Sequence, residues 1–342
     1  MLNTALQDLL LAIDAELRAR LPAAGLTPLL TQMLEYHLGW RDAQGQPATL
    51  DAGKRLRPVL CLLCCQASGG DWTTALPAAA AVELLHNFTL IHDDIQDRSP
   101  ERRHRATVWA LWGTAQAINA GDALHAIAHQ AVLGLAERGV PAERVLAAAR
   151  TLTTACLQIV DGQVRDLQFE TQSAVSLDDY RAMIARKTAA LIGAACALGA
   201  LVGGAGTDRI AAYQTFGEQL GLGFQIVDDI LGIWGEAHRT GKPAADDLYK
   251  HKKTLPLLYA LQTAPPDDAR RLRALLHKPD LTADEVTAII AILDACGAQA
   301  FARAEARRAR DAALRALAQA DPLEPARSAL WAMADRLVER DH

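Results

Sequence analysis

The chain carries two pairs of adjacent aspartates, and each pair ends an apolar, helix-like run. The first is Asp93-Asp94, followed by Asp97, and the second is Asp228-Asp229. On a helix, Asp93 and Asp97 share one face and Asp94 lies about 100° around it. Carboxylates at this spacing repel one another and are costly to bury unless a cation meets them. Mg²⁺ prefers a few carboxylates together with phosphate oxygens, so the two runs predict a magnesium site that grips a diphosphate between them.

Basic residues near these acids suit phosphate groups. Lys54 and Arg57 precede an apolar helix whose first turn accommodates Pro58, so both side chains are expected near a helix N-terminus, a natural anion site. Further basic residues follow the two acidic runs or open an apolar helix: Arg102, Arg103, Arg186, Lys187, Lys242, Lys252 and Lys253. Any one of them alone is more simply a solvated surface charge. Together, spaced around two aspartate pairs, they favour phosphate binding.

The elements that must position these residues are predicted to be helices. Of 342 residues, 51% are hydrophobic and only 5% aromatic, and alanine and leucine dominate. Apolar residues recur at three- and four-residue spacing, and the capping patterns at 176–179 and 282–285 begin two of the helices. No alternating run bounded by turn dipeptides is present, so no strand is expected. Nothing resembles a linker, so residues 1–342 are predicted to form one all-α domain of antiparallel helices.

Composition also limits the partners. The net charge of −5 and the pI of about 6.1 give no global field for nucleic acid or an anionic membrane. The six cysteines lie mostly in apolar runs without a second ligand cluster, which predicts buried thiols. The N-terminus lacks a targeting pattern, and no uncharged apolar stretch of about 18 residues reads as a membrane span, although 188–206 comes near. A cytoplasmic protein without stable membrane insertion or nucleic-acid partner is expected.

The motifs and their order resemble those of the trans-isoprenyl diphosphate synthases, over roughly residues 53–256. The matching segments are 53–58, 83–86, 93–97 with Arg102-Arg103, 162–163, 187–188, 224–229, 241–243 and 252–256. The resemblance implies an all-α isoprenoid-synthase helical bundle around a central cavity, usually a homodimer, with three Mg²⁺ between the two aspartate-rich helices.

Roles follow by position within each matching motif. The resemblance implies that Asp93, Asp94, Asp97 and Asp228 are metal ligands, supported by Asp229. It implies that Arg102, Lys187 and Lys242 bind the allylic diphosphate, and that Lys54, Arg57, His86 and Arg103 cradle isopentenyl diphosphate. Thr188, Gln225 and Lys252 would line the reacting region or help to hold phosphate.

The implied reaction explains this charge pattern. When diphosphate leaves an allylic carbon, such as that of dimethylallyl, geranyl or farnesyl diphosphate, negative charge develops on oxygen and a delocalised cation remains. Mg²⁺, lysine and arginine stabilise the oxygen charge, and an apolar pocket keeps water from the cation. The isopentenyl double bond then attacks and a proton leaves. No residue resembles a dedicated general base, and the departing diphosphate is the family's usual candidate.

One position departs from the family pattern. The second acidic run of the family normally ends in a third aspartate, and here that position is Gly232. Asp246 and Asp247 in the following loop could partly compensate. Catalysis is still expected, because the first run and the basic positions are intact.

Product length is predicted from the residues one helical turn before Asp93. Phe88 and Thr89 occupy those positions. A single phenylalanine followed by a small residue resembles the geranylgeranyl (C20) type, with farnesyl or C25 products as alternatives. The alternative is that Phe88 is an ordinary core aromatic, and the chain-length role with a C20 product is the hypothesis preferred here.

Two other functions remain open. A class I terpene cyclase would share the bundle and the acidic helices but would not need Lys54, Arg57 and His86 as a second diphosphate cradle. A regulatory subunit of a synthase would share the fold without turnover. His125 and His129 with Asp122 could form a metal site, but helix packing is favoured.

Overall fold

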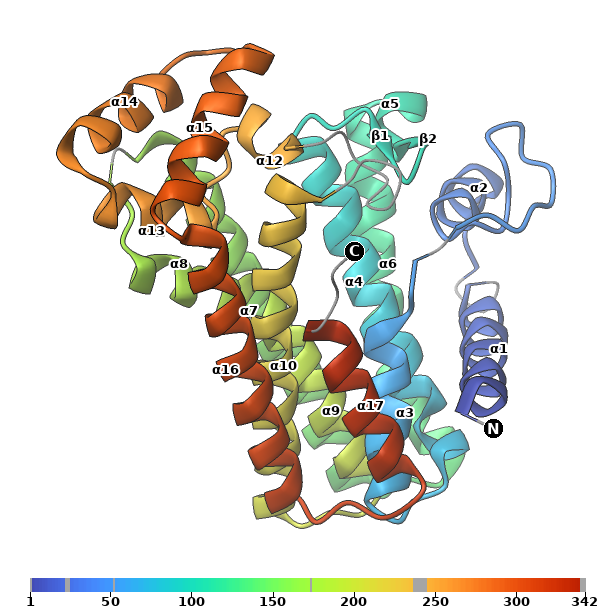
Figure 1. Cartoon of the computed structure of the whole chain (residues 1–342). Coiled ribbons are helices and arrows are strands. Elements are labelled where there is room, and N and C mark those ends of the chain that lie inside the picture. Colours follow the sequence, from blue (N-terminus) through green and yellow to red (C-terminus); the bar gives the residue numbers. More distant parts are fainter. Residues whose placement is uncertain (1, 22–24, 52, 173, 236–244, 339–342) are drawn as a thin grey trace. The chain divides into compact units, whose positions relative to one another are not determined.

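The computed structural model describes residues 2–21, 25–51, 53–172, 174–235 and 245–338 (Figure 1). The chain divides into two compact units. Unit 1 comprises Met1–Cys156, Ala194–Gln214 and Gln319–Leu330, and unit 2 comprises Leu157–Gly193, Thr215–Ala318 and Trp331–His342. The all-α class is confirmed, and the organisation as one domain around a central cavity stays a prediction.

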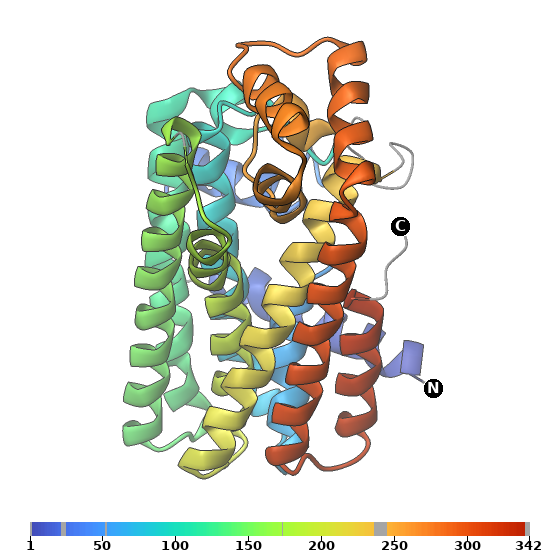
Figure 2. The ribbon, with the colours of Figure 1, turned by 60° about the vertical axis from the view of Figure 1, so that its left-hand side comes forward.

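Unit 1 contains the first acidic run and the predicted isopentenyl diphosphate residues. Its elements are α1 (Leu2–Arg20), α2 (Pro28–His37), α3 (Leu56–Ala67), the 3₁₀ turn η2 (Trp72–Ala75), α4 (Leu76–Gln96), β1 (Glu101–Arg102), β2 (Arg105–Ala106), α5 (Val108–Trp112), α6 (Thr114–Leu133) and η3 (Gly134–Arg138). Helix α4 begins with Pro77 in its first turn and is buried through the alanines at 78–81. It lies beside α6 in both views (Figures 1 and 2).

A buried ionic group fastens the start of α3 within unit 1. Arg55 precedes α3 in a left-handed conformation with φ of 45°. Its Nη2 lies 3.3 Å from Asp14 Oδ1 on α1, and its Nη1 lies 3.7 Å from Glu83 Oε1 on α4. Asp14 also accepts a hydrogen bond from Trp40 Nε1 at 2.9 Å. Because Lys54 directly precedes Arg55 and Arg57 lies in the first turn of α3, this anchoring also restrains the backbone that carries them.

The expectation of no strand is wrong for four residues. β1 and β2 pair antiparallel, with Glu101 opposite Ala106 and Arg102 opposite Arg105. The two-residue turn consists of Arg103 and His104, with φ of 52° and 58°. A type I′ hairpin turn needs positive φ at both central residues and usually uses Asn-Gly or Asp-Gly. The sequence contains no hairpin signal, because neither turn residue is glycine, asparagine or aspartate. Each strand is also too short to show an alternation of apolar and polar residues.

Unit 2 contains the second acidic run. Wholly within it lie α8 (Leu177–Ile184), the π-helical turn η4 (Ala185–Ala189), α12 (Asp246–Tyr249), α13 (Leu255–Thr263), α14 (Pro266–Leu276) and α15 (Ala283–Ala295). The unit boundary falls inside α7 (Ala142–Thr171), α9 (Ala190–Val202), α10 (Thr207–Trp234), α16 (Ala298–Gln319) and α17 (Ala326–Val338).

The aspartate-bearing end of α10 packs on α16. Ile226, Val227 and Ile230 are buried against Ala302 and Ala306, and the two helices lie side by side in Figure 2. The predicted capping patterns are confirmed: Ser176 with Asp179 and Thr282 with Glu285 each form a capping box, at the starts of α8 and α15. Small residues on α16 let the two helices approach closely, which holds the second acidic run on a rigid element.

Within the residues that the structure describes, two helical stretches are apolar enough by length and composition to cross a membrane, contrary to the expectation from the sequence. They are Trp72–Gln96 and Leu177–Val202, and the bent pair Ala283–Ala295 with Ala298–Gln319 would add a third if it were one span. In each of the two stretches, 78% of the apolar window is buried inside the protein. Their apolar surface is therefore covered largely by other protein segments. The cysteine prediction holds, since all six are free and five of them are buried.

Candidate active site

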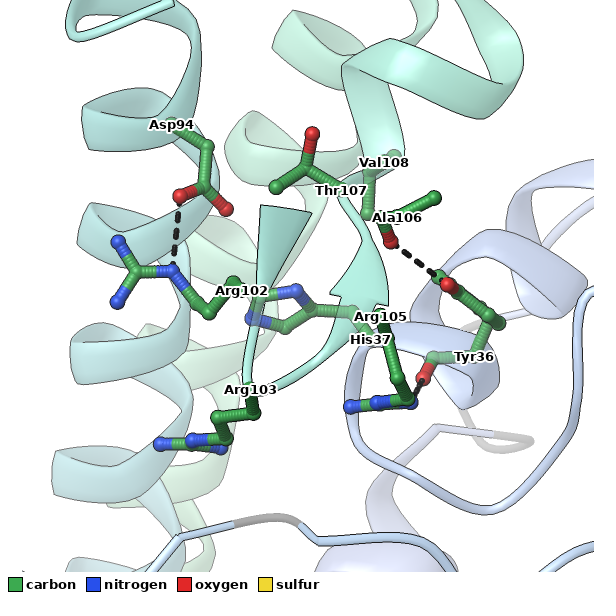
Figure 3. Close-up of a pocket in the computed structure, with 9 residues that line it drawn as sticks. All are labelled: Tyr36, His37, Asp94, Arg102, Arg103, Arg105, Ala106, Thr107 and Val108. Atoms are coloured by element: carbon green, nitrogen blue, oxygen red, sulfur yellow. Dashed lines mark hydrogen bonds and ion pairs between the residues drawn. The ribbon is translucent and has the colours of Figure 1, made fainter. Parts of the chain in front are cut away.

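The three aspartates at the end of α4 lie in different environments. Asp94 is buried, Asp93 is half-buried, and Asp97 is exposed where the helix ends. Arg102 Nε donates a hydrogen bond of 2.8 Å to Asp94 Oδ1 (Figure 3). Burial raises the pKa of Asp94 to about 6, and the positive charge of Arg102 acts in the opposite direction. A predicted metal ligand is thus paired with a residue predicted to bind the allylic diphosphate.

The short hairpin aims its arginines in different directions. Arg102 reaches Asp94, whereas Arg105 Nη1 donates to the backbone oxygen of Tyr36 at 3.0 Å. Tyr36 Oη in turn donates to the backbone oxygen of Ala106 at 2.6 Å. The hairpin is therefore fastened to the end of α2, and Arg103 stands at its tip (Figure 3).

Gly53 brings the Lys54 loop against Arg103. The φ of Gly53 is +86°, and a Cβ placed there would lie 2.4 Å from Arg103 Nη2 and 2.8 Å from its Cζ. Only glycine leaves room for the guanidinium at this point. Residues from two of the predicted motifs, 53–58 and Arg102-Arg103, therefore meet within unit 1.

The predicted isopentenyl diphosphate residues form a cationic cluster. Burial lowers the pKa of His86 well below its usual value, and the charges of Arg57, Arg103 and Arg102 lower it further. Burial also lowers the pKa of Arg57 to about 10, opposed by Glu83. Arg57 Nε is buried without a hydrogen-bond partner in the described part of the chain. Positive charges held this close, with one buried guanidinium N–H left without a hydrogen bond, suit an anion.

In unit 2, three predicted residues form one hydrogen-bonded chain. Thr188 Oγ1 donates to Gln225 Oε1 at 2.8 Å, and Gln225 Nε2 donates to Asp229 Oδ1 at 3.2 Å. The other oxygen of Asp229 accepts hydrogen bonds from the Tyr180 hydroxyl and from the backbone N–H of Leu255, the latter at 2.9 Å. Asp229 therefore joins α8, α10 and α13, which fits the supporting role predicted for it.

Lys187 lies on the π-helical turn η4 and forms an ion pair with Asp166 on α7. Such turns are rare and frequently occur at functional sites. The carboxylate of Asp166 meets the Lys187 ammonium directly. The lysine is half-buried, so the ion pair orients it rather than hiding it from solvent.

Gly232 makes room for Asp247. A Cβ at Gly232 would lie 1.9 Å from Asp247 Oδ2 and 2.5 Å from its Cγ. Asp247 is buried, and its charge helps to raise the pKa of Asp229. Asp246 is also buried and bonds Lys250 at 2.8 Å. The Asp247 carboxylate therefore occupies the space in which the side chain of a third aspartate would begin.

The remaining predicted residues are less constrained. Asp228 and Lys252 are exposed, and so is Lys54. Lys242 lies outside the described residues. Among those that are described, no group of three His, Cys, Asp or Glu side chains is placed to hold a metal, so His125 and His129 do not form the metal site considered above. Their rings instead pack together, 4.6 Å apart, and His129 bonds Thr153.

The aspartate side chains nevertheless suit a hard divalent cation. All of the predicted ligands are carboxylates, the donors that Mg²⁺ prefers, and Asp93, Asp97 and Asp228 are not fully buried. A cation that also binds phosphate oxygens does not need a closed cage of protein ligands.

Sequence reasoning missed several residues of these sites. His37 and Tyr36 line the pocket of Figure 3 together with Asp94 and the hairpin arginines. Tyr180 is buried and bonds Asp229. For Tyr180, no local pattern indicates a bond to Asp229, which lies 49 residues along the chain. For Tyr36 and His37, no local pattern links the end of α2 to a hairpin far along the chain.

Replacing Gly232 with alanine should destabilise the protein by about 1–3 kcal/mol, because the added methyl group displaces the buried Asp247 carboxylate. A loss of stability would be informative, because replacing glycine with alanine inside a helix usually stabilises the protein. The measurement is urea unfolding of Gly232→Ala, Asp247→Ala and the double variant. In the Asp247→Ala background the added methyl group should cost little, and an equal cost in both backgrounds would contradict the steric explanation.

Asp229 should make stability depend on pH. Burial raises its pKa to about 7 in the folded protein, so between about pH 4 and pH 7 the folded state holds a proton that the unfolded state has lost. Taken alone, this proton makes the free energy of unfolding fall as pH rises, by at most about 1.4 kcal/mol per pH unit. Asp94, with a pKa of about 6, adds a similar fall at lower pH. His37, His86 and His125 act in the opposite direction below about pH 6.5, because burial lowers their pKa in the folded protein. The contribution of Asp229 is therefore the difference between the wild type and a variant that lacks this carboxyl group.

Urea unfolding in EDTA of wild type and Asp229→Asn tests this expectation. Asp228→Asn removes the exposed neighbouring charge and is the matched control. Relative to the wild type, Asp229→Asn should lose the part of the slope that falls with rising pH, whereas Asp228→Asn should keep the wild-type slope. If the free energy of unfolding depended on pH in the same way in all three proteins, the role given to Asp229 would be refuted.

The chain is similar to known proteins over most of its length. The sequence model of the polyprenyl synthetase family matches residues 44–293. The geranylgeranyl diphosphate synthase of Mycobacterium tuberculosis (strain ATCC 25618 / H37Rv) is 45% identical over 294 residues, covering 86% of this chain and 82% of that protein. The (2E,6E)-farnesyl diphosphate synthase of the same strain is 40% identical over 315 residues, covering 86% of each.

A solved structure agrees with these relatives. The polyprenyl synthetase from Streptomyces coelicolor A3(2) superposes with a TM-score of 0.90 at 38% identity, covering 98% of this chain and 99% of that one. The family match spans well over half of the residues, and the acidic and basic motifs lie inside it. The chain therefore belongs to the polyprenyl synthetase family.

Proposed function

We propose that this protein is a magnesium-dependent trans-prenyltransferase that joins isopentenyl diphosphate to an allylic diphosphate. The observation that carries the proposal is the cationic cluster of unit 1, in which Arg57, His86 and Arg103 interact closely. This cluster is a second phosphate site beside the aspartates at the end of α4. A reaction between two diphosphates needs two such sites.

The residues of each site have separate tasks. Asp93, Asp94, Asp97 and Asp228 would hold magnesium, which supplies positive charge to the departing diphosphate. Lys187, aligned by Asp166, and Arg102 neutralise the same oxygens as charge develops on them. Lys54, Arg57, His86 and Arg103 orient isopentenyl diphosphate so that its double bond faces the allylic carbon.

The structure of unit 2 suggests how the reacting region stays ordered. Thr188 and Gln225 are fixed by the chain of hydrogen bonds that ends at Asp229. Their carbonyl and hydroxyl oxygens are therefore held in place, where they can face a carbocation without reorganising. Lys242 and Lys252 remain proposed phosphate partners on the basis of their motifs.

The two rival functions predict different results. A terpene cyclase has no use for the cluster around Arg57, and a regulatory subunit has no need for an intact first acidic run. Purified protein should be incubated with labelled isopentenyl diphosphate and dimethylallyl, geranyl or farnesyl diphosphate, with and without Mg²⁺. Elongated prenyl diphosphates formed only with Mg²⁺ support the proposal. A cyclic hydrocarbon, or no product with any primer, overturns it.

Substrate constants should separate the two sites. Arg103→Met should raise the KM for isopentenyl diphosphate about ten- to a hundredfold, because a charge-assisted hydrogen bond is lost, and should leave the KM for the allylic primer nearly unchanged. Asp93→Asn should instead lower kcat by about a hundredfold or more. An equal effect of Arg103→Met on both substrates would contradict the division.

Phe88 is proposed to limit the product to C20. The two relatives described above make different products, so the argument is structural. The Phe88 ring is half-buried between α4 and α6, 4.9 Å from the His92 ring and 5.1 Å from the His125 ring. It is therefore not an ordinary core phenylalanine. Thr89, whose hydroxyl bonds the backbone oxygen of His86 at 2.7 Å, adds little bulk beside it.

Replacing Phe88 with alanine should lengthen the main product to C25 or beyond, because the ring no longer blocks the growing chain. Phe88→Leu keeps most of the bulk and should retain C20. Chromatography of the dephosphorylated products measures the lengths. Identical products from both variants and the wild type would remove Phe88 from this role.

A homodimer is proposed from an exposed apolar stripe on α7. Leu146, Leu157, Val160 and Val164 are 66%, 68%, 47% and 48% exposed and share one helix face. Apolar groups gathered on one face indicate a surface that another protein covers. A second copy of the chain suits the symmetric pairing that most soluble oligomers use.

Val160→Glu should shift the protein from dimer to monomer in sedimentation velocity, because each interface would bury two charges. Leu11→Glu is the control, since Leu11 is 70% exposed and belongs to another helix, α1. A wild type that sediments as a monomer would refute the dimer, and dissociation by both variants would refute its location on α7.

The proposed cellular setting is the cytoplasm, without stable membrane insertion and without nucleic acid as a partner. The burial of both apolar helical stretches and the slightly acidic net charge support it.

A further inference from the structure

One glycine of α7 lies directly against the backbone of the π-helical turn η4. A Cβ placed on Gly162 would lie 2.3 Å from the backbone nitrogen of Lys187 and 2.7 Å from its Cα, and 2.9 Å from the carbonyl carbon of Arg186. Ordinary van der Waals contact begins at about 3.4 Å, so any side chain here would move the two backbones about 1 Å apart. Because the obstacle is backbone, no rotation of a side chain can relieve it.

A second glycine, on α10, lies against the same turn. A Cβ placed on Gly221 would lie 2.6 Å from the Cα of Ala189 and 2.9 Å from its Cβ. Lys187 and Ala189 are two residues apart, and such residues lie on nearly opposite sides of a helix. Helices α7 and α10 therefore enclose η4 from two directions, and all of these residues belong to unit 2.

The enclosed turn presents two side chains to these helices. Lys187 forms its ion pair with Asp166, four residues after the α7 glycine. Thr188 donates its hydrogen bond of 2.8 Å to Gln225, four residues after the α10 glycine. Residues four apart lie on the same face of a helix. Each helix therefore uses one face for two purposes, a glycine that admits the backbone of η4 and, one turn later, the partner of a side chain on η4.

We propose that Gly162 and Gly221 are positioning residues for prenyl transfer. Because they carry no side chain, η4 lies close enough to α7 and α10 for Lys187 and Thr188 to reach their partners. This inference rests on the function proposed above, in which the Lys187 ammonium meets the allylic diphosphate and Thr188 lines the reacting region. The two glycines themselves touch no substrate and act through the turn.

The π-helical form of the turn makes this support necessary. The N–H of Ala190 bonds the oxygen of Ala185, five residues earlier, so the turn holds one residue more than an α-helical turn. One additional residue changes the direction of the neighbouring side chains by about 100° relative to an uninterrupted α-helix. The directions of Lys187 and Thr188 therefore depend on keeping this turn, and backbone contact from two helices holds it in place.

The experiment compares wild type, Gly162→Ala, Gly221→Ala and the control Gly203→Ala. In the control, the added Cβ would lie 2.5 Å from the backbone oxygen of Cys65 on α3, so it creates a backbone clash of the same kind within unit 1 that does not involve η4. Thermal unfolding reports folding, and all assays are run at a temperature at which the variants are folded.

Two measurements follow binding and turnover separately. Isothermal titration calorimetry with geranyl diphosphate and Mg²⁺, without isopentenyl diphosphate, gives the affinity for the primer in the absence of elongation. Initial rates with both substrates then give kcat and the KM for isopentenyl diphosphate.

Gly162→Ala should bind geranyl diphosphate about tenfold more weakly, because the Lys187 ammonium is displaced from the phosphate oxygens. Its kcat should fall about a hundredfold, as a displacement of about 1 Å can cause. The KM for isopentenyl diphosphate should stay within about twofold, because the residues proposed to bind that substrate belong to unit 1.

Gly221→Ala should affect turnover more than binding. Its kcat should fall about tenfold or more, while the affinity for the primer changes by less than about threefold, because Thr188 lines the reacting region rather than binding phosphate. Gly203→Ala should unfold at a lower temperature but keep a kcat and a primer affinity close to those of the wild type.

A double variant distinguishes the positioning of Lys187 from a general loss of structure. Lys187→Met removes the ammonium, so Gly162→Ala should cause almost no additional loss of primer affinity in that background. A full additional loss there would overturn the proposal, as would equal losses in folded Gly162→Ala and Gly203→Ala. If neither Gly162→Ala nor Gly221→Ala folds, the glycines serve folding rather than positioning, and the proposal fails as well.

The calorimetric and kinetic results separate this inference from the function on which it rests. If wild type binds geranyl diphosphate in a Gly162-dependent manner but elongates no primer, the positioning of Lys187 stands and the prenyltransferase proposal fails. If wild type elongates primers and both glycine variants match it in every constant, the reverse holds.

Discussion

Like charges held together inside a protein must be balanced by something of opposite sign, and this constraint shapes unit 1. Arg57, His86, Arg102 and Arg103 influence one another closely, and burial lowers the pKa of both Arg57 and His86. Two devices keep these groups in place. The Arg55 ion pairs hold the start of α3, and the hairpin, fastened to α2, carries Arg102 and Arg103. The rest of the unit serves as scaffold for a concentration of positive charge that a diphosphate would neutralise.

In unit 2 the buried charge is a carboxylate, and hydrogen bonds rather than opposite charges stabilise it. Asp229 is buried and receives hydrogen bonds from Tyr180, Gln225 and the Leu255 backbone, while Asp228, its neighbour on α10, is exposed. Adjacent residues on a helix point about 100° apart, so one aspartate can organise the interior while the next stays available to a ligand. The same division holds at the end of α4, where Asp94 is buried and Asp97 is exposed.

The helical class could be predicted because it depends on local spacing, and the same spacing drew attention to the two acidic runs. The metal- and phosphate-binding roles rest on the resemblance and stay predictions. The hairpin could not be predicted, because Arg103 and His104 adopt positive φ. Glycine or asparagine at these positions is the usual sequence signal for such a turn, and neither is present. His37 and Tyr180 were not predicted as site residues for a different reason. Their importance depends on partners distant in sequence, the hairpin arginines in one case and Asp229 in the other, and no periodic pattern records such a pairing. Gly232 was noticed as an exception, but its physical cause, the Asp247 carboxylate, required coordinates.

The tight fit between Gly232 and Asp247 also constrains how this sequence can change over evolutionary time. Any side chain at position 232 collides with the carboxylate at 247, so a return to the three-aspartate pattern cannot be the first of the two substitutions without harm. Position 247 must shrink or move beforehand, and that step removes a buried acid next to Asp229. The side chains that each of these two positions can accept therefore depend on the residue at the other.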